Sequence, residues 1–208
     1  MTNNRTAYSS LTVGILALQG AYEAHAKTLQ SLGVTTKLIR TPDDLTTPPK
    51  IDGLIIPGGE STTMLKFLER NHFLDALTTF VQTNPTFGTC AGAILLAKDV
   101  QHPAQTSLAA MDITVERNAY GRQIDSAITT APTKLEGAPL EMVFIRAPRI
   151  THTGPQVEIL ATRDDFPVLV REGHLLAATF HPELSADTRV HQFFLDMIRD
   201  MAAASKPS

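Results

Sequence analysis

Short apolar runs alternate with amphipathic stretches through the first half of this 208-residue chain. Leu11–Leu18 is a continuous apolar run, typical of a strand that is covered on both faces. The stretch 21–32 follows with the pattern of a helix and stops at Gly33. Thr35–Ile39 and Ile51–Ile56 are the next two strands that the pattern predicts. Strand–helix alternation of this kind indicates a parallel sheet with helices on both faces.

Beyond the first half the pattern is less regular until the end of the chain. The last amphipathic segment has the clearest pattern, because its apolar residues recur at the spacing of one helical face. These residues are Val190, Phe193, Phe194, Met197, Ile198 and Met201. The other expected elements are helices at 61–70, 73–82 and 91–98, strands at 86–89, 168–170 and 175–180, and a strand-rich segment from 100 to 160. The sequence therefore predicts an α/β fold of three layers, with a mostly parallel central sheet and helices on both faces.

Length and composition narrow the class of protein. We expect one domain at 11–201, between flexible tails at 1–10 and 202–208. The net charge of −3 and the absence of long Lys/Arg runs argue against binding to nucleic acid or an anionic membrane. The polar N-terminus and the lack of a long apolar run predict neither a signal peptide nor a membrane span. The expected location is therefore the cytoplasm.

The single cysteine, Cys90, excludes an internal disulfide and disfavours a cysteine-based zinc site. Histidines other than His181 show no metal-ligand spacing, so we expect no metal and no cofactor. We interpret them as surface or core-edge residues; they are His25, His72, His102, His152, His174 and His191.

The segment Gly88-Thr89-Cys90-Ala91-Gly92 has the spacing of a nucleophile elbow, with cysteine in place of serine. Small neighbours allow the sharp strand-to-helix turn, and the positive end of the helix dipole favours the reactive thiolate. A free cysteine is more often a buried, inert side chain. The glycines on both sides and the strand–turn–helix setting favour a nucleophile here.

A thiolate nucleophile needs a base and a group that orients the base. Phe180-His181-Pro182-Glu183 supplies both, because residues i and i+2 of an extended chain point the same way. The alternative is a structural histidine at a strand end. Together with an elbow cysteine, His181 and Glu183 instead predict a catalytic triad.

Other segments have the properties of a binding site. The segment 56–61 ends a strand with Gly58 and Gly59, whose N–H groups can approach a developing oxyanion, although it also fits a plain turn with Ser61 at the helix start. Arg117 and Arg146 could each hold a substrate carboxylate, although spacing alone favours a surface arginine at each position.

The elbow cysteine with His-x-Glu resembles the class I, or triad, glutamine amidotransferases. Further blocks narrow the resemblance to the glutaminase subunits of pyridoxal 5′-phosphate synthase, over residues 12–200. The blocks are LALQGAYEAH at 16–25, GLIIPGGESTTM at 53–64, FGTCAGAILLAK at 87–98, VERNAYGRQIDS at 115–126, FIRAP at 144–148 and FHPEL at 180–184. Ala17 and the pair Ala119-Tyr120 depart from the family pattern, and the first ten residues have no counterpart in it.

The resemblance implies a role for each residue that matches the family pattern. Cys90 would be the nucleophile, His181 the base and Glu183 the carboxylate that orients it. The expected glutamine-binding residues are Gly59, Glu60, Ser61, Arg117, Ile145 and Arg146. The Gly58–Gly59 peptide and the Ala91 amide would form the oxyanion hole. The implied activity is hydrolysis of L-glutamine through a thioester on Cys90, with transfer of ammonia to a separate barrel-shaped synthase that makes pyridoxal 5′-phosphate.

Three other interpretations remain open at this point. The chain could serve a different acceptor, as a histidine-pathway amidotransferase does, although the Gly-Gly-Glu-Ser and Glu-Arg-Asn blocks weigh against it. It could be a cysteine peptidase with the same elbow. It could also be a scaffold that kept the fold and lost catalysis, which the complete triad disfavours.

Overall fold

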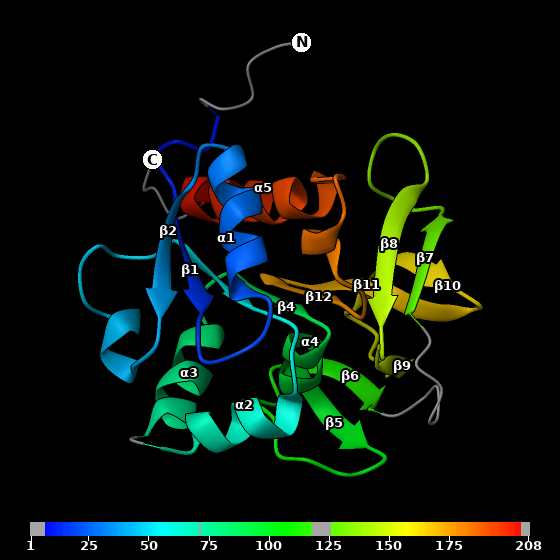
Figure 1. The fold of residues 1–208 in the computed structure, drawn as a ribbon, viewed down its shortest axis with the longest axis horizontal. Coiled ribbons are helices and arrows are strands. Elements are labelled where there is room, and N and C mark those ends of the chain that lie inside the picture. Colours follow the sequence, from blue (N-terminus) through cyan, green and yellow to red (C-terminus); the bar gives the residue numbers. More distant parts are fainter. Residues whose placement is uncertain (1–6, 71, 118–125, 205–208) are drawn as a thin grey trace.

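The computed structural model describes residues 7–70, 72–117 and 126–204 (Figure 1). Within them, the central sheet has seven strands in the order β10-β11-β12-β4-β3-β1-β2. Five of the strands are parallel: β1 (Thr12–Leu16), β2 (Thr35–Ile39), β3 (Gly53–Ile56), β4 (Thr86–Thr89) and β12 (Leu175–Ala178). Two antiparallel strands, β10 (Glu158–Arg163) and β11 (Phe166–Glu172), extend one edge. The mostly parallel sheet that the sequence predicted is confirmed.

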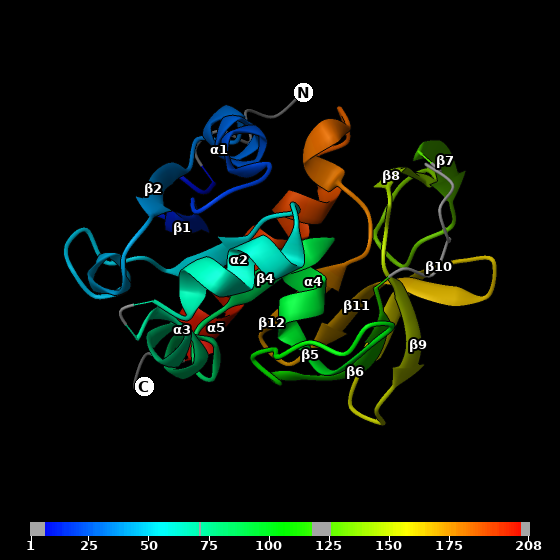
Figure 2. The same ribbon diagram turned by 60° about the horizontal axis from the view of Figure 1, so that its bottom comes forward.

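Helices cover both faces of this sheet (Figures 1 and 2). Helices α1 (Tyr22–Ser31) and α5 (Arg189–Ala204) pack on one face, and α2 (Ser61–Leu68), α3 (Phe73–Val81) and α4 (Ala91–Leu96) pack on the other. Strand β3 shows why two cores form. Ile55 belongs to the cluster with α1 and α5, whereas its neighbours Leu54 and Ile56 belong to the cluster with α2, α3 and α4. The three-layer prediction is therefore confirmed.

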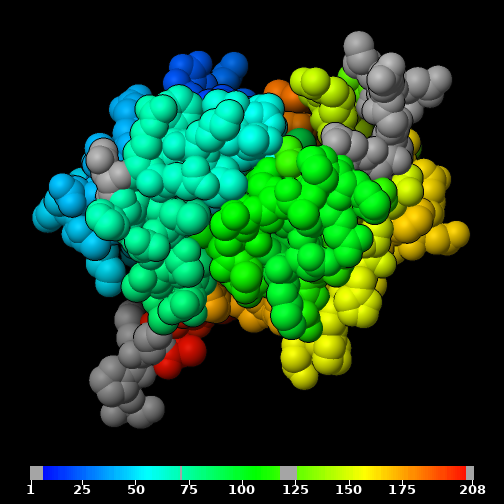
Figure 3. All heavy atoms as spheres, turned by 90° about the horizontal axis from the view of Figure 1, so that it is seen from below, coloured from blue at the N-terminus to red at the C-terminus, as the bar shows by residue number. Residues whose placement is uncertain are grey.

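The strand-rich middle of the chain forms two small sheets beside the main one (Figure 1). One contains β5 (Ala97–Gln101), β6 (Met111–Glu116) and β9 (Arg149–Thr153), and the other pairs β7 (Ser126–Ala131) with β8 (Leu140–Ile145). Two short 3-10 turns, η2 (Pro42–Leu45) and η3 (Pro182–Leu184), complete the elements. Figure 3 shows α2 and α3, in cyan to teal, packed beside the green segment that contains β5 and β6.

Some element ends differ from the expectation. The helix expected at 91–98 stops at Leu96, because Ala97 adopts extended backbone and begins β5, where it pairs with Met111 of β6. The last helix continues to Ala204, beyond the expected domain end at residue 201. At the other end, Tyr8 lies inside the expected N-terminal tail, yet its ring is buried and its hydroxyl donates to Asp196 Oδ1 at 3.0 Å. No helix in the described ranges is long and apolar enough to cross a membrane.

Candidate active site

An open cleft of about 370 Å³ lies beyond the carboxyl ends of β3 and β4. This is where a parallel sheet usually binds its ligands. Most of the residues that the sequence singled out line it: Gly58, Gly59, Glu60, Ser61, Cys90, Arg117, Ile145, Arg146 and His181. Ala91 and Glu183 are buried directly behind Cys90 and His181. The structure thus brings together segments from five distant parts of the sequence.

Cys90 occupies the sharp turn between β4 and α4. Its backbone has φ 47° and ψ −101°, a strained conformation for a residue with a side chain. Its N–H donates to the carbonyl of Ala178 at 2.8 Å, which ties the turn to β12. A Cβ on Gly92 would overlap the carbonyl oxygen of Ile56, so the chain can turn this tightly only with glycine there. The predicted elbow is confirmed as a backbone feature.

His181 and Glu183 lie on the segment that follows β12. His181 Nδ1 is 2.7 Å from Glu183 Oε1, and both side chains are buried. The His181 N–H donates to the carbonyl of Val143 at 2.8 Å, which holds the segment against β8. We expected an extended chain through Glu183, but Pro182 instead starts the short turn η3, with Glu183 inside it. The turn still aims the carboxylate at the imidazole.

The charges of the three side chains support one another. Burial lowers the pKa of His181, but hydrogen bonds with Cys90 and Glu183 outweigh burial and raise it to about 10. Burial raises the pKa of Glu183, but the nearby His25 and the hydrogen bond with His181 bring it below its usual value. At neutral pH the site therefore holds an imidazolium that is hydrogen-bonded to both the Glu183 carboxylate and Cys90.

The loop with the two glycines is anchored from the segment before α1. Ala21 N–H donates to the carbonyl of Gly58 at 3.0 Å, and Gln19 bonds the backbone of Glu60 in both directions, at 2.9 and 3.3 Å. Gly20 has φ 86°, and a Cβ there would overlap the Gly58 carbonyl oxygen. Because a trans peptide points its N–H opposite to its C=O, the Gly59 N–H points away from Ala21.

A polar wall closes the cleft at the start of α2. Glu60 caps the helix by accepting from the N–H groups of Thr62 and Thr63, at 3.1 and 2.6 Å. Burial raises the pKa of Glu60, but these bonds dominate and lower it to about 2. Arg117 donates to Thr62 Oγ1 at 2.7 Å and lies 3.7 Å from Glu60. The guanidinium of Arg117 is thereby fixed on the cleft wall.

Arg146 differs from Arg117 in its surroundings. It is exposed at the cleft and has positive φ, 45°, at the end of β8. Among the described residues it has no ion-pair partner. Its charge is thus available to an anionic group in the cleft, which distinguishes it from an ordinary surface arginine.

Sequence reasoning missed several residues around the site. Our interpretation of His25 and His191 as surface or core-edge residues is wrong, because both are fully buried and His25 lies 3.3 Å from Glu183 Oε2. A signal was present in His25, which shares the apolar face of its helix with Leu29, one turn later. Gln19 and Ala21 gave no such signal, because their contacts with the glycine loop depend on the fold.

Some expectations remain untested by the geometry. The departing pair Ala119-Tyr120 lies outside the described residues, as does most of the block after Arg117. In the described part of the chain, no group of three or more His, Cys, Asp or Glu side chains is placed to hold a metal ion.

Comparison with known proteins gives consistent matches. The SNO glutamine amidotransferase family matches residues 15–200. A pyridoxal 5′-phosphate synthase subunit PdxT from Koribacter versatilis is 55% identical over 94% of this chain and 100% of its own length. The subunit of that name from Francisella philomiragia is 47% identical over 90% of this chain and 99% of its own. A crystal structure of a glutamine amidotransferase superposes with a TM-score of 0.82 at 42% identity, covering 90% and 98% of the two chains.

Proposed function

Since the chain belongs to the SNO glutamine amidotransferase family, we propose that it hydrolyses L-glutamine to L-glutamate and ammonia as the glutaminase subunit of a pyridoxal 5′-phosphate synthase. The observation that carries this proposal is the strained Cys90 elbow next to the buried His181–Glu183 pair, at the bottom of an open cleft. A structural cysteine would need neither the backbone strain nor the charged partner.

Each residue of the triad has one role in this reaction. The Cys90 thiolate attacks the side-chain amide carbon of glutamine, and a C–S bond forms as the carbonyl oxygen gains negative charge. The His181 imidazolium gives its proton to the amide nitrogen, so that the C–N bond breaks and ammonia leaves a γ-glutamyl thioester. Neutral His181 then takes a proton from water. That water attacks the thioester, and the C–S bond breaks to give glutamate and restore the thiolate. Glu183 orients and stabilises the imidazolium throughout.

The oxyanion that forms in both steps needs donors in fixed positions. Ala91 N–H lies in the first turn of α4, where a helix leaves its N–H groups without intrahelical acceptors. Gly59 N–H is the second candidate, because Gly58 packs against both Cys90 and His181. Two donors from different elements would therefore converge on the oxygen that becomes charged.

The amino-acid end of glutamine needs a site for its carboxylate and its ammonium group. Arg146 is the better candidate for the carboxylate, because Arg117 already bonds Thr62. The carboxylate of Glu60 faces the cleft in its ionised form and could attract the ammonium group. Gly59, Ser61 and Ile145 would complete the surface around the substrate.

The partner follows from the matched relatives, whose printed name is that of a synthase subunit. Glutamate is the product left in the cleft, and ammonia is a nucleophile that a synthase can use. We therefore propose that this chain binds a synthase subunit and delivers ammonia to it.

The test is release of glutamate and ammonia from L-glutamine by the chain together with its purified synthase subunit. We expect turnover with the natural sequence and none with Cys90→Ala. A glutamine-mimicking electrophile should label Cys90 alone. Thr86→Val is a matched control, since Thr86 is a buried polar residue at the start of β4, the strand that leads to Cys90, away from the cleft. Turnover by Cys90→Ala, or hydrolysis of peptides in place of glutamine, would contradict the proposal.

A further inference from the structure

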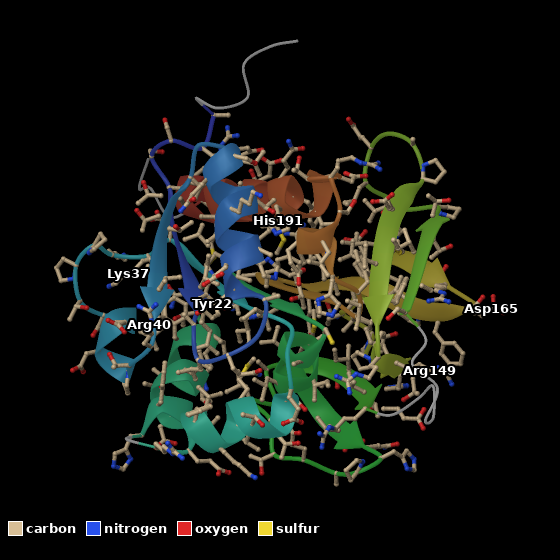
Figure 4. The ribbon with its side chains drawn as sticks, viewed as in Figure 1. Tyr22, Lys37, Arg40, Arg149, Asp165 and His191 are labelled. Atoms are coloured by element: carbon tan, nitrogen blue, oxygen red, sulfur yellow. The ribbon has the colours of Figure 1, made fainter. Side chains whose placement is uncertain are left out.

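A chain of buried polar side chains lies behind the triad, on the side of Glu183 that faces away from His181. His25 Nε2 is 3.3 Å from Glu183 Oε2 and 3.1 Å from Thr89 Oγ1. His25 Nδ1 is 3.0 Å from His191 Nε2. Both histidines are completely buried between α1 and α5, and Figure 4 labels His191 at that junction. The chain therefore runs from α5 through α1 to the carboxylate of the triad.

Both buried histidines are neutral at pH 7. Burial lowers the pKa of His25 to about 4, in spite of the opposing attraction of Glu183. Burial and the proximity of His25 hold the pKa of His191 well below its usual value. A neutral imidazole carries one N–H and one acceptor nitrogen, so each contact in the chain has a defined donor. His25 thus acts on Glu183 through an N–H dipole and not through a full positive charge.

Neutral His25 can carry its proton on either ring nitrogen, and the two tautomers make different contacts with Glu183 and His191. If His25 carries its proton on Nε2, the N–H donates to Thr89 Oγ1 at 3.1 Å, the Glu183 carboxylate lies 3.3 Å from the same nitrogen, and Nδ1 accepts from His191 Nε2–H. If His25 carries it on Nδ1, a lone pair faces the carboxylate, and His191 must bury an N–H at Nδ1. His191 Nδ1 has no hydrogen-bond partner among the described residues. A buried donor without a partner and a lone pair against a carboxylate are both unfavourable, so the first arrangement is preferred.

The contact with His25 also stabilises the second carboxylate oxygen of Glu183. Within the described residues, Glu183 Oε2 is a buried oxygen with no aligned hydrogen bond, although Oε1 is bonded to His181. An ionised carboxylate in such a setting needs a positive dipole close to its second oxygen. The protonated Nε2 of His25, 3.3 Å away, is the group that supplies it, while its N–H is aligned with Thr89 Oγ1.

We propose that His25 is a positioning residue for the triad, whose protonated Nε2 lies 3.3 Å from Glu183 Oε2 and keeps Oε1 turned toward His181. His191 fixes the proton of His25 on the nitrogen that faces the carboxylate. Thr89, which precedes Cys90, bonds the same nitrogen and links the elbow to this chain. The effect of His25 on turnover rests on the proposed function, but the assignment of the protons on His25 and His191 does not.

The first experiment measures alkylation of Cys90 by iodoacetamide between pH 4 and 9, which needs neither glutamine nor a synthase. The titratable groups that face Glu183 are His25 from α1, His191 from α5 through His25, and His181 with Cys90 from the active site. In His25→Leu, Glu183 should take up a proton at higher pH and stop stabilising the imidazolium that pairs with the thiolate. We expect alkylation on the acidic limb to slow about tenfold, a shift of about one pH unit.

The second experiment measures glutamine turnover of the same variants with the synthase subunit. We expect His25→Leu to lower kcat about 10–100-fold, the range seen when groups that orient catalytic ligands are lost, with little change in KM. His25→Gln retains an N–H donor near the position of Nε2 and should restore most of both properties. Thr86→Val, the buried control on β4, should change neither the alkylation profile nor kcat.

The outcomes separate the possible failures. An unshifted alkylation profile in folded His25→Leu, or a shift that Thr86→Val reproduces, would overturn the positioning role. Absence of turnover with the natural sequence would contradict the proposed function and leave the alkylation result intact. If His25→Leu does not fold, nitrogen-15 NMR of the natural protein decides the question. A proton on Nδ1 of His25 would overturn the proposal, and one on Nε2 would support it.

Discussion

Among individual residues, His181 sets how the activity responds to alkaline pH. Its pKa is raised to about 10 by Cys90 and Glu183 against the opposing effect of burial, so the acid that protonates the leaving amide nitrogen persists above neutrality. We expect kcat to stay level from pH 7 to about 9 and to fall as pH approaches about 10. Glu183→Gln removes one of the groups that raise this pKa, so its alkaline decline should begin at lower pH. Measuring kcat of both proteins from pH 6 to 10.5, with the synthase present, checks the two expected declines. A decline of the natural protein near pH 6.5 would contradict the assignment.

The roles of His181 and Glu183 predict different losses. His181→Asn removes the group that transfers protons and should lower kcat by about 10³-fold or more. Glu183→Gln keeps the shape and removes only the charge that orients the imidazole, so its loss should be smaller. Single-turnover assays of glutamate formation, with circular dichroism as a check of folding, measure the difference. A larger loss for Glu183→Gln would reverse the assigned roles.

At the scale of elements, the segment before α1 controls the glycine loop. Gly20 has φ 86° and no room for a Cβ, which would overlap the Gly58 carbonyl oxygen. Gly20→Ala should therefore break the bond between Ala21 and Gly58 and displace the Gly59 N–H. Loss of one oxyanion donor typically lowers the rate about 10²–10³-fold, and we expect a fall of that size in kcat.

Gly173→Ala is the matched control for this prediction. Gly173 also has positive φ, 57°, in the turn between β11 and β12, but no atom lies within 4 Å of the position of a Cβ. Its substitution carries the same backbone strain, about 1–2 kcal/mol, without a clash near the cleft. Thermal unfolding should detect the strain in both variants, and kcat should fall only in Gly20→Ala. Equal kcat in the two variants would show that the position of the Gly58–Gly59 loop does not affect catalysis.

For the whole molecule, binding of the synthase should control the glutaminase. Two adjacent glycines allow the Gly58–Gly59 peptide to reorient, at the cost of the hydrogen bond from Ala21, about 1 kcal/mol. A partner that contacts one orientation better shifts the population toward it. We expect the isolated chain to hydrolyse glutamine more slowly than the complex, because only the synthase holds the peptide in the orientation that aims the Gly59 N–H at the oxyanion, and the difference should appear in kcat. Glutamate release at saturating glutamine, with and without the synthase, tests this. Full activity of the isolated chain would contradict it.

Much of the fold and of the candidate site could be predicted because the signals were local. Apolar periodicity predicted the strands and helices, and the glycines around Cys90 predicted an elbow that the positive φ confirms. His181 and Glu183 are two residues apart, so their contact was also visible in the sequence. The end of α4 was harder to place, because Ala97 leaves the helix to pair with a strand that begins fourteen residues later.

The resemblance to the amidotransferases implied which residues would meet in the cleft. The sequence by itself determined the order of the elements and the elbow. These depend on periodicity and on short spacings that backbone geometry enforces. Only the tertiary structure decided which charges act on one another. His25 and His191 are 166 residues apart, and the fold buries them together behind Glu183. Likewise, Arg117 is engaged by Thr62 while Arg146 remains free among the described residues. Burial and proximity set those differences, and both arise only when distant segments pack.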